Sequence, residues 1–388
     1  MNGRRPPSVS RPLIVGALIG FAIGAPLRTS AMPPFAQAYG VKCNVCHTQV
    51  PALNTYGRYV QRTGYSSLDP HVLERAVPVW VGENLNYDVN GSPRWTPGNL
   101  AVHAVGFLGD DVTYHFQQWI WQNNAAGDLD TFWMTYNNLL HRDGHLFLGF
   151  IQAPAPGPFN QWMDLAPFAT PQITVGEHAY ELDANRWGAK FNYERGSLDI
   201  EAGYMYEGET ASSNWSASTD FANTDKTFQY KVAYANPQYP TEAGVYGSRG
   251  SFPLAEGGFD QYWSLAPYVE RDPTYGFPGI LAIYQFAHDS NPGFNTLPGG
   301  RLASLGPTPS TAQTLEIYEA VFNQGMLSYR HEWTNALGVL TQSANVDFSY
   351  PLARFLRLYV EEYFVPNSKP GWAGTIWWTT PLNNVKNP

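Results

Sequence analysis

The feature that most constrains the fold is a two-residue alternation that repeats in segment after segment beyond Val77. In the stretch 198–207, Leu198 and Tyr204 fall on one face, while Asp199 and Met205 fall on the other. Successive side chains of a β-strand point to opposite faces, so this alternation predicts a strand. The same split recurs at 186–194, 227–234, 112–121 and 356–361. We predict roughly sixteen such strands, each about long enough to cross a bilayer when tilted.

The faces of these strands favour an outer-membrane barrel over a soluble sandwich or propeller. Their apolar side is rich in Tyr, Trp and Phe, and aromatic residues make up 15% of the chain. A soluble sheet would pack mainly aliphatic side chains inward, whereas a barrel places aromatic girdles where it meets the lipid headgroups. The opposite faces carry charges, which a water-filled lumen tolerates and a packed core does not. Aromatic pairs near predicted strand ends are Trp119/Trp121, Tyr204/Tyr206 and Trp377/Trp378.

The amino terminus predicts export from the cytoplasm. Arg4, Arg5 and Arg11 precede an apolar run from 13 to 25, and small residues follow at 29–31. This order is typical of a cleaved signal peptide. An uncleaved anchor is the alternative, but a spanning helix needs about 20 apolar residues.

Between the signal and the strands lies a short segment with helical spacing. Leu53, Tyr56 and Val60 recur at the helical period, Pro51 suits a first turn, and Gly64 suits a helix end. A segment this short does not bury a core by itself, so we expect it in or against the barrel lumen. The predicted organisation is a signal peptide at 1–31, a small helical segment at 32–76 and an outer-membrane barrel at 77–388.

The motif with the most specific chemistry is Cys43-Asn-Val-Cys46-His47. This is the attachment pattern of haem c: two thiols add to the vinyl groups of the porphyrin, and the adjacent histidine ligates the iron. A thioredoxin-type dithiol would need a βαβ context, and a zinc site would need two further ligands nearby. We therefore predict one covalently attached haem c with His47 as the proximal ligand, so that 32–76 is a monohaem cytochrome c segment. For the sixth ligand, commonly Met or His, the candidates are His71 and the inward-facing Met205.

Charge limits the partners. The whole chain has a formal charge of -9, and the predicted signal carries four arginines and no acid, so the mature chain is near -13. This balance disfavours nucleic acid and favours cations or basic proteins. Four acids in predicted loops could hold a cation briefly, although each also suits an ordinary solvated loop charge. They are Asp128, Asp130, Glu207 and Glu209.

The segment around the motif resembles a known family. Its motifs are similar to the amino-terminal part of the fused cytochrome–porin proteins, which include outer-membrane cytochromes of iron-oxidising bacteria. The resemblance implies a monohaem domain that plugs a sixteen-stranded barrel and moves electrons across the outer membrane, from Fe(II) at the cell surface to a periplasmic cytochrome c. The rest of the chain is similar in architecture alone. The matching residues are Pro34-Phe35-Ala36, Tyr39-Gly40, Cys43 to His47, Pro51 to Asn54, Gly57-Arg58 and Gly64-Tyr65.

Three functions therefore stay open on the sequence. The first is an electron conduit in the outer membrane, which could act as an Fe(II) oxidase. The second is a diffusion porin whose haem-bearing segment is a structural plug or gate. The third is a soluble periplasmic haem protein with a small-molecule activity.

Overall fold

A computed structural model describes most of the chain from Pro33 to Pro381. The predicted signal peptide at 1–31 and the carboxyl-terminal residues 382–388 lie outside the described residues, as does the predicted boundary at 76/77. The described ranges are 33–50, 52–73, 79–88, 94–122, 125–154, 173–180, 184–206, 226–274, 276–296, 298, 300–322, 325–353 and 356–381.

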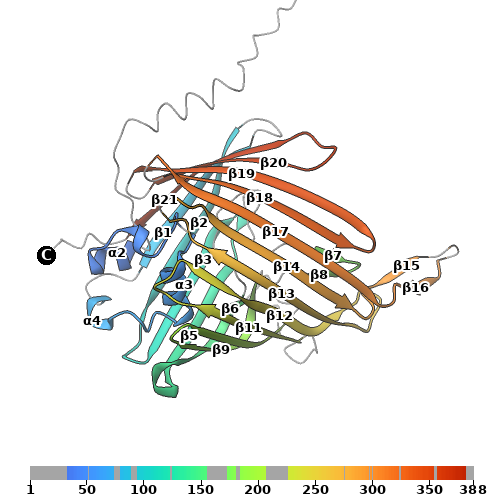
Figure 1. The fold of residues 1–388 in the computed structure, drawn as a ribbon, viewed down its shortest axis with the longest axis horizontal. Helices are drawn as coiled ribbons and strands as arrows, with labels where there is room; N and C mark the ends of the chain where they lie inside the picture. The colour runs from blue at the N-terminus through green and yellow to red at the C-terminus, as the bar shows by residue number, and fades with distance from the viewer. Residues whose placement is uncertain are drawn as a thin grey trace, which may run out of the picture.

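The described strands form a closed antiparallel barrel of sixteen long strands, which confirms the predicted fold (Figure 1). Each strand pairs with the next along the chain, and β21 returns to pair with β1, from Trp80 opposite Pro381 to Asp88 opposite Ala373. The two-residue β4 (Ala125–Ala126) pairs with the last two residues of β3. The sixteen are β1 Val79–Asp88, β2 Arg94–Phe107, β3 Val112–Gln122, β5 Leu129–Leu139, β6 Gly144–Gln152, β9 Asn185–Arg195, β10 Leu198–Tyr206, β11 Lys226–Ala235, β12 Thr241–Pro253, β13 Phe259–Arg271, β14 Gly279–Asp289, β17 Thr308–Val321, β18 Gly325–Ala336, β19 Val339–Ala353, β20 Leu356–Phe364 and β21 Gly371–Pro381.

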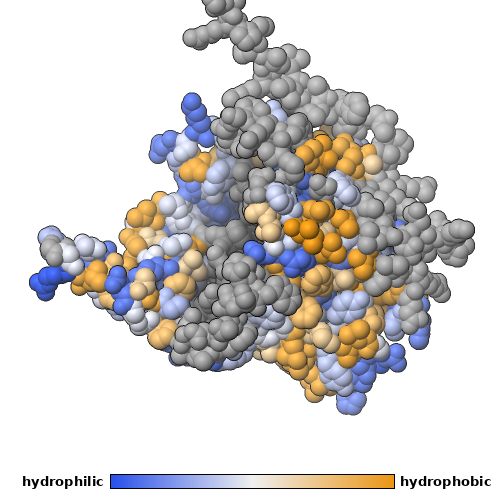
Figure 2. Space-filling model, turned by 180° about the vertical axis from the view of Figure 1, so that it is seen from behind, coloured by the Kyte–Doolittle hydropathy of each residue, from blue (hydrophilic) through white to orange (hydrophobic). Residues whose placement is uncertain are grey.

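On β10 the alternation has the predicted orientation, with the charged residues inside and Tyr204 outside. On β10, Asp199, Glu201 and Met205 are buried inside the barrel, whereas Tyr204 is 57% exposed on the outer face. Figure 2 shows hydrophobic side chains gathered in patches over the outer surface. Such an exterior suits lipid contact, so the sandwich, the propeller and the soluble haem protein do not fit this fold.

Two of the predicted girdle residues were placed on the wrong face. Trp119 and Trp377 are buried, at 7% and 8% exposure. Trp377 and Trp378 are consecutive, so alternation sends one of them inward. Trp119 pairs with Ala101 and Trp121 with Leu100, so a bulge in β3 sends the two indoles to opposite faces. On the inner side, Trp119 donates a hydrogen bond through Nε1 to Asp130 Oδ1 at 3.0 Å. Trp121 and Tyr204 are exposed outside, as predicted.

The segment before the barrel is helical, as predicted. It contains α2 (Pro33–Tyr39), the 3₁₀ turn η1 (Cys43–Val45), α3 (Thr55–Arg62) and α4 (Pro70–Leu73). Helix α3 begins at Thr55, where Asn54 caps it; the predicted first-turn Pro51 lies outside the described residues. Gly64, with φ of +55°, follows the helix end as expected. None of the described helices is both long and apolar enough to cross a membrane.

The two ends of the barrel differ. We call the end where β1 begins and β21 ends the plug mouth, because α2 and α4 lie there and α3 reaches into the barrel (Figure 1). The opposite end is the hairpin mouth. Two small hairpins lie there: β7 (Ile173–Val175) with β8 (His178–Tyr180), and β15 (Phe294–Thr296) with β16 (Leu302–Ser304). The short turn η2 (Leu140–Arg142) lies between β5 and β6.

Candidate functional site

The predicted haem-attachment motif forms one tight turn. The backbone N–H groups of Cys46 and His47 both donate to the carbonyl oxygen of Cys43, at 3.1 and 3.0 Å. Cys43 is 2% exposed and His47 is 8% exposed, and burial raises the pKa of the Cys46 thiol to about 11. The structure thus brings Cys43, Cys46 and His47 together as the sequence predicted, in a conformation fixed by the turn's own backbone.

Asn54 joins this turn to α3. Its backbone N–H donates to the carbonyl oxygen of Cys46 at 2.9 Å, and its side-chain amide donates to the carbonyl oxygens of Asn44 and Val45 at 3.3 and 3.1 Å. Its Oδ1 accepts from the N–H of Gly57 at 2.9 Å, which caps the helix. A single side chain therefore holds the motif against the first turn of α3.

Replacing Asn54 with alanine is expected to loosen the motif, and a second variant separates the two roles of the side chain. Loss of an N-cap costs about 0.5–2 kcal/mol, and N54A also removes the donors to the motif turn. Asn54→Asp keeps the Oδ1 acceptor but has no amide donor, so it should recover the capping part of the loss alone. The measurement is the denaturant dependence of protease cleavage in the segment 33–73; equal cleavage in N54A and wild type would contradict the role.

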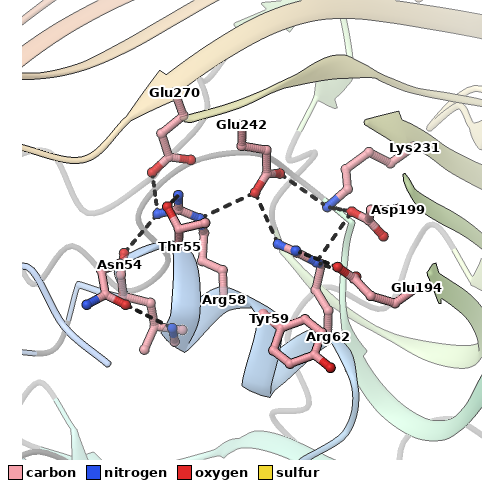
Figure 3. Close-up of polar contacts among 12 residues, drawn as sticks. Asn54, Thr55, Arg58, Tyr59, Arg62, Glu194, Asp199, Lys231, Glu242 and Glu270 are labelled. Carbon is pink, nitrogen blue, oxygen red and sulfur yellow. Dashed lines mark hydrogen bonds and ion pairs between the residues drawn. The ribbon is translucent and has the colours of Figure 1, made fainter. Parts of the chain in front are cut away.

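On one face of α3, Arg58 forms a buried set of ion pairs with the barrel wall (Figure 3). Its Nη1 lies 2.7 Å from Glu270 Oε1 and 3.2 Å from Asp272 Oδ1, and its Nε lies 3.5 Å from Glu242 Oε2. Asp272 also accepts from the N–H and the hydroxyl of Thr55, at 2.6 and 2.5 Å. The amino-terminal half of α3 is thereby tied to β12, to β13 and to the residue that follows β13.

Arg62 extends the same network one helical turn further (Figure 3). Its Nε lies 3.0 Å from Glu194 Oε2 and 3.4 Å from Asp199 Oδ2, and its Nη1 lies 3.1 Å from Glu242 Oε2. Lys231 Nζ bridges the wall acids, at 2.8 Å from Asp199 Oδ2. We call this set the lumen network: Arg58, Arg62, Lys190, Lys231, Glu194, Asp199, Glu201, Glu242, Glu270 and Asp272.

The opposite face of α3 packs on apolar wall residues. Val60 of α3 and Tyr65, which follows the helix, belong to a buried cluster with Trp80, Trp133 and Met205. The Tyr65 hydroxyl lies 3.0 Å from His115 Nδ1. Before the helix, Gln49 contacts Ser349 and the carbonyl oxygen of Val50 accepts from the Tyr359 hydroxyl. The segment therefore touches the wall on opposite sides of the lumen and forms a plug.

The sixth-ligand candidates have different surroundings. Met205 lies inward, as the alternation predicted, and packs at Gly188 and Gly203, where an added Cβ would lie 3.0 and 2.7 Å from its side chain. It is 1% exposed within the apolar cluster at α3. His71 is exposed on α4, and its backbone N–H donates to Asp69 Oδ1 at 2.9 Å. Both assignments stay predictions.

One of the four carboxylates predicted to lie in loops was placed in the wrong kind of element. Asp130 is not a loop residue: it lies in β5, where its Oδ1 accepts from Trp119 and its Oδ2 accepts from the Thr131 hydroxyl at 3.0 Å. Asp128 lies just before β5 and is partly exposed. Glu207 and Glu209 lie outside the described residues.

The sequence did not reveal the lumen network as a site, although two signals for it were present. Arg58 and Arg62 have the i, i+4 spacing that places side chains on one helix face. The acids at 194, 199 and 242 occupy inward positions of strands whose residues alternate between the two faces. The sequence does not show which strands face α3. The inward histidine His115 behind Tyr65 was missed for the same reason.

Comparisons with known proteins bear on the fold. No protein-family model matches the chain, and no curated protein matches it in sequence. Among solved structures, it is similar to the anion-selective porin from Comamonas acidovorans, with a TM-score of 0.51 and 12% identity over 78% of this chain and 98% of that one. It is also similar to OprB of Pseudomonas putida, with a TM-score of 0.50 and 8% identity over 80% and 96%. The chain thus has the fold of an outer-membrane porin barrel.

Proposed function

We propose that this protein is an outer-membrane electron conduit, with one haem c carried by the plug segment on Cys43, Cys46 and His47. The observation that carries the proposal is continuity: the motif turn is held by Asn54 to α3, and α3 is held by Arg58 and Arg62 to the wall. A cofactor on the motif is therefore fixed relative to the barrel. A flexible tether would not give it a defined position.

The residues present suit the cofactor. Two thiols and an imidazole on one turn are the donor set of a c-type haem: Cys43 and Cys46 would form the thioethers, and His47 would ligate the iron. When bound, the haem supplies a one-electron change at iron. The chain's own contribution is placement and exclusion of water, since Cys43 packs with the buried Ala36 and the partly buried Val50.

The barrel would let such a cofactor carry electrons across the membrane. The hydrocarbon core of a bilayer is about 30 Å thick, so a carrier at either surface remains far from the other side. A plug that enters the lumen carries its cofactor part of that distance inside protein. The donor we propose is Fe(II) on one side and the acceptor a soluble cytochrome c on the other, because the acidic chain attracts cations and basic proteins.

A diffusion porin with a haem-bearing plug is the second candidate, and the likeness in fold to porins supports it directly. Against free diffusion stands the plug itself, whose arginines pair with acids on β9, β10, β12 and β13. A lumen filled in this way hinders the passage of solutes.

Vesicles separate the two candidates. Purified protein is inserted into vesicles loaded with oxidised cytochrome c, Fe(II) is added outside, and reduction inside is followed together with ion conductance. We expect the wild type to reduce the trapped cytochrome, and H47A to fall to the rate of protein-free vesicles. The matched control is His141→Asn, a change at an exposed turn residue in a left-handed conformation that asparagine tolerates.

Other outcomes have clear meanings. Equal reduction in H47A and wild type would remove the electron conduit. High conductance with reduction that H47A retains would favour the diffusion porin, because an open pore admits Fe(II) to the trapped cytochrome. Purified protein without covalent haem absorbance would contradict the cofactor assignment itself.

A further inference from the structure

The hairpin mouth contains a buried group of ionisable side chains that the plug does not use. His178 comes from β8, Asp260 from the start of β13 and Asp289 from the end of β14, and all three are 0% exposed. One potential ligand atom from each lies within 4.8 Å of the other two. On β13 ten residues separate Asp260 from Glu270 of the lumen network, or about 33 Å of strand. This group therefore lies far from the haem motif.

The hydrogen bonds of the two carboxylates leave one oxygen of each unused. Asp260 Oδ1 accepts from the N–H of Asn291 at 2.8 Å and from the hydroxyl of Ser290 at 3.1 Å. Asp289 Oδ1 pairs with His178 Nδ1 at 2.7 Å and accepts from the Tyr180 hydroxyl at 2.9 Å. Among the described residues, no donor forms a hydrogen bond with Asp260 Oδ2 or Asp289 Oδ2.

This arrangement is costly without a further positive charge. With both carboxylates ionised and His178 protonated, the group has a net charge of -1 within aromatic surroundings. The ring of His178 lies 4.7 Å from that of Phe252 and 4.3 Å from that of Tyr262. Burying an uncompensated charge or an unbonded polar oxygen is unfavourable. A bound cation would supply the missing charge and a partner for both Oδ2 atoms.

We propose that His178, Asp260 and Asp289 bind one divalent transition-metal cation at the hairpin mouth. His178 Nδ1 lies 3.5 Å from Asp260 Oδ2, close to the spacing of two ligands that each lie about 2.1 Å from one ion. One imidazole with two carboxylates suits zinc, iron(II) or manganese. The site goes beyond the proposed function, because it needs no haem.

A metal here would join the β7–β8 hairpin to the barrel wall. The hairpin packs its Ile173, Val175 and Tyr180 on inward residues of the wall strands, and the cation would add a link to β13 and β14. The competing explanation is a proton shared between the two carboxylates, which would satisfy the same oxygens without metal.

The test uses the full-length protein in detergent, stripped with a chelator and dialysed against zinc. We expect the wild type to take up one equivalent of zinc more than D289N. The zinc affinity of D289N at this site should fall by at least about 100-fold, because losing a residue that only orients a metal ligand already lowers affinity by up to about 100-fold. The matched control is E256Q, which removes the same charge from an exposed loop residue and should keep the equivalent. Barrel folding is checked by heat-dependent mobility in gels.

A second measurement needs no variant. X-ray absorption at the zinc edge of the wild type should show imidazole and carboxylate ligands. A wild type that takes up no more zinc than D289N, or a spectrum with water oxygens alone, would overturn the site and leave the shared proton. Covalent haem is read from the absorbance of the same sample, so failure of the electron-conduit proposal is seen separately.

Discussion

Replacing Arg62 with methionine is expected to release the plug and raise the ion conductance of the barrel. The change leaves Glu194, Asp199 and Glu242 without the guanidinium that neutralises them. Removing one partner of a buried ion pair costs about 3–5 kcal/mol, which lowers the ratio of seated to released plug by about 10² to 10³ or more. The methionine keeps much of the side-chain volume, so the loss is electrostatic.

The control for this prediction is Arg142→Met. Arg142 also forms an ion pair, with Asp111 at 3.2 Å, but its side chain is 65% exposed. An exposed pair contributes about 0–1 kcal/mol, so R142M should conduct like the wild type. Conductance is recorded from single channels in planar bilayers, and protease cleavage of the segment 33–73 is measured in parallel. A plug in R62M that is as closed and as protected as in R142M would show that the lumen network does not hold it.

Gly57→Ala is expected to reduce covalent haem attachment several-fold while the barrel stays folded. On helix propensity alone the change should stabilise α3 by about 1 kcal/mol. A Cβ at this position, however, would lie 2.0 Å from the carbonyl oxygen of Cys46 and 3.0 Å from Leu53 Cδ2. The first contact is with backbone, so no side-chain rotation relieves it, and overpacking of this kind typically costs 1–3 kcal/mol or more.

The clash lies at the turn that contains the haem-attachment cysteines. Because the Cys46 carbonyl belongs to the motif turn and also accepts from Asn54 N–H, the turn must move away from α3. The control is Gly374→Ala in β21, where the nearest atom to an added Cβ is 3.8 Å away. Haem is measured per polypeptide from the absorbance of purified protein. Equal haem content in G57A and G374A would mean that this packing does not shape the motif.

The sequence determined the barrel and the motif because both depend on local rules. The two-residue period fixes which side chains of a strand share a face, and this placed Asp199, Glu201 and Met205 inward without reference to any other strand. The spacing of Cys43, Cys46 and His47 is likewise local, since one turn brings them together. Gly64 ended α3 as expected because a left-handed residue commonly closes a helix.

Tertiary structure decided everything that depends on which strands meet. Arg58 and Arg62 are separated from their acidic partners by 132 to 214 residues, and His178 by 111 from Asp289. The closure of the barrel, through β21 against β1, determines which inward faces oppose α3 and which meet the β7–β8 hairpin. Trp119 was misplaced because the bulge in its pairing with β2 settled its face, whereas Trp377 was misplaced because two consecutive residues of a strand cannot share one face. Alternation within a strand determines which residues face the lumen. Closure of the barrel determines which of those lumen-facing residues meet and form a site.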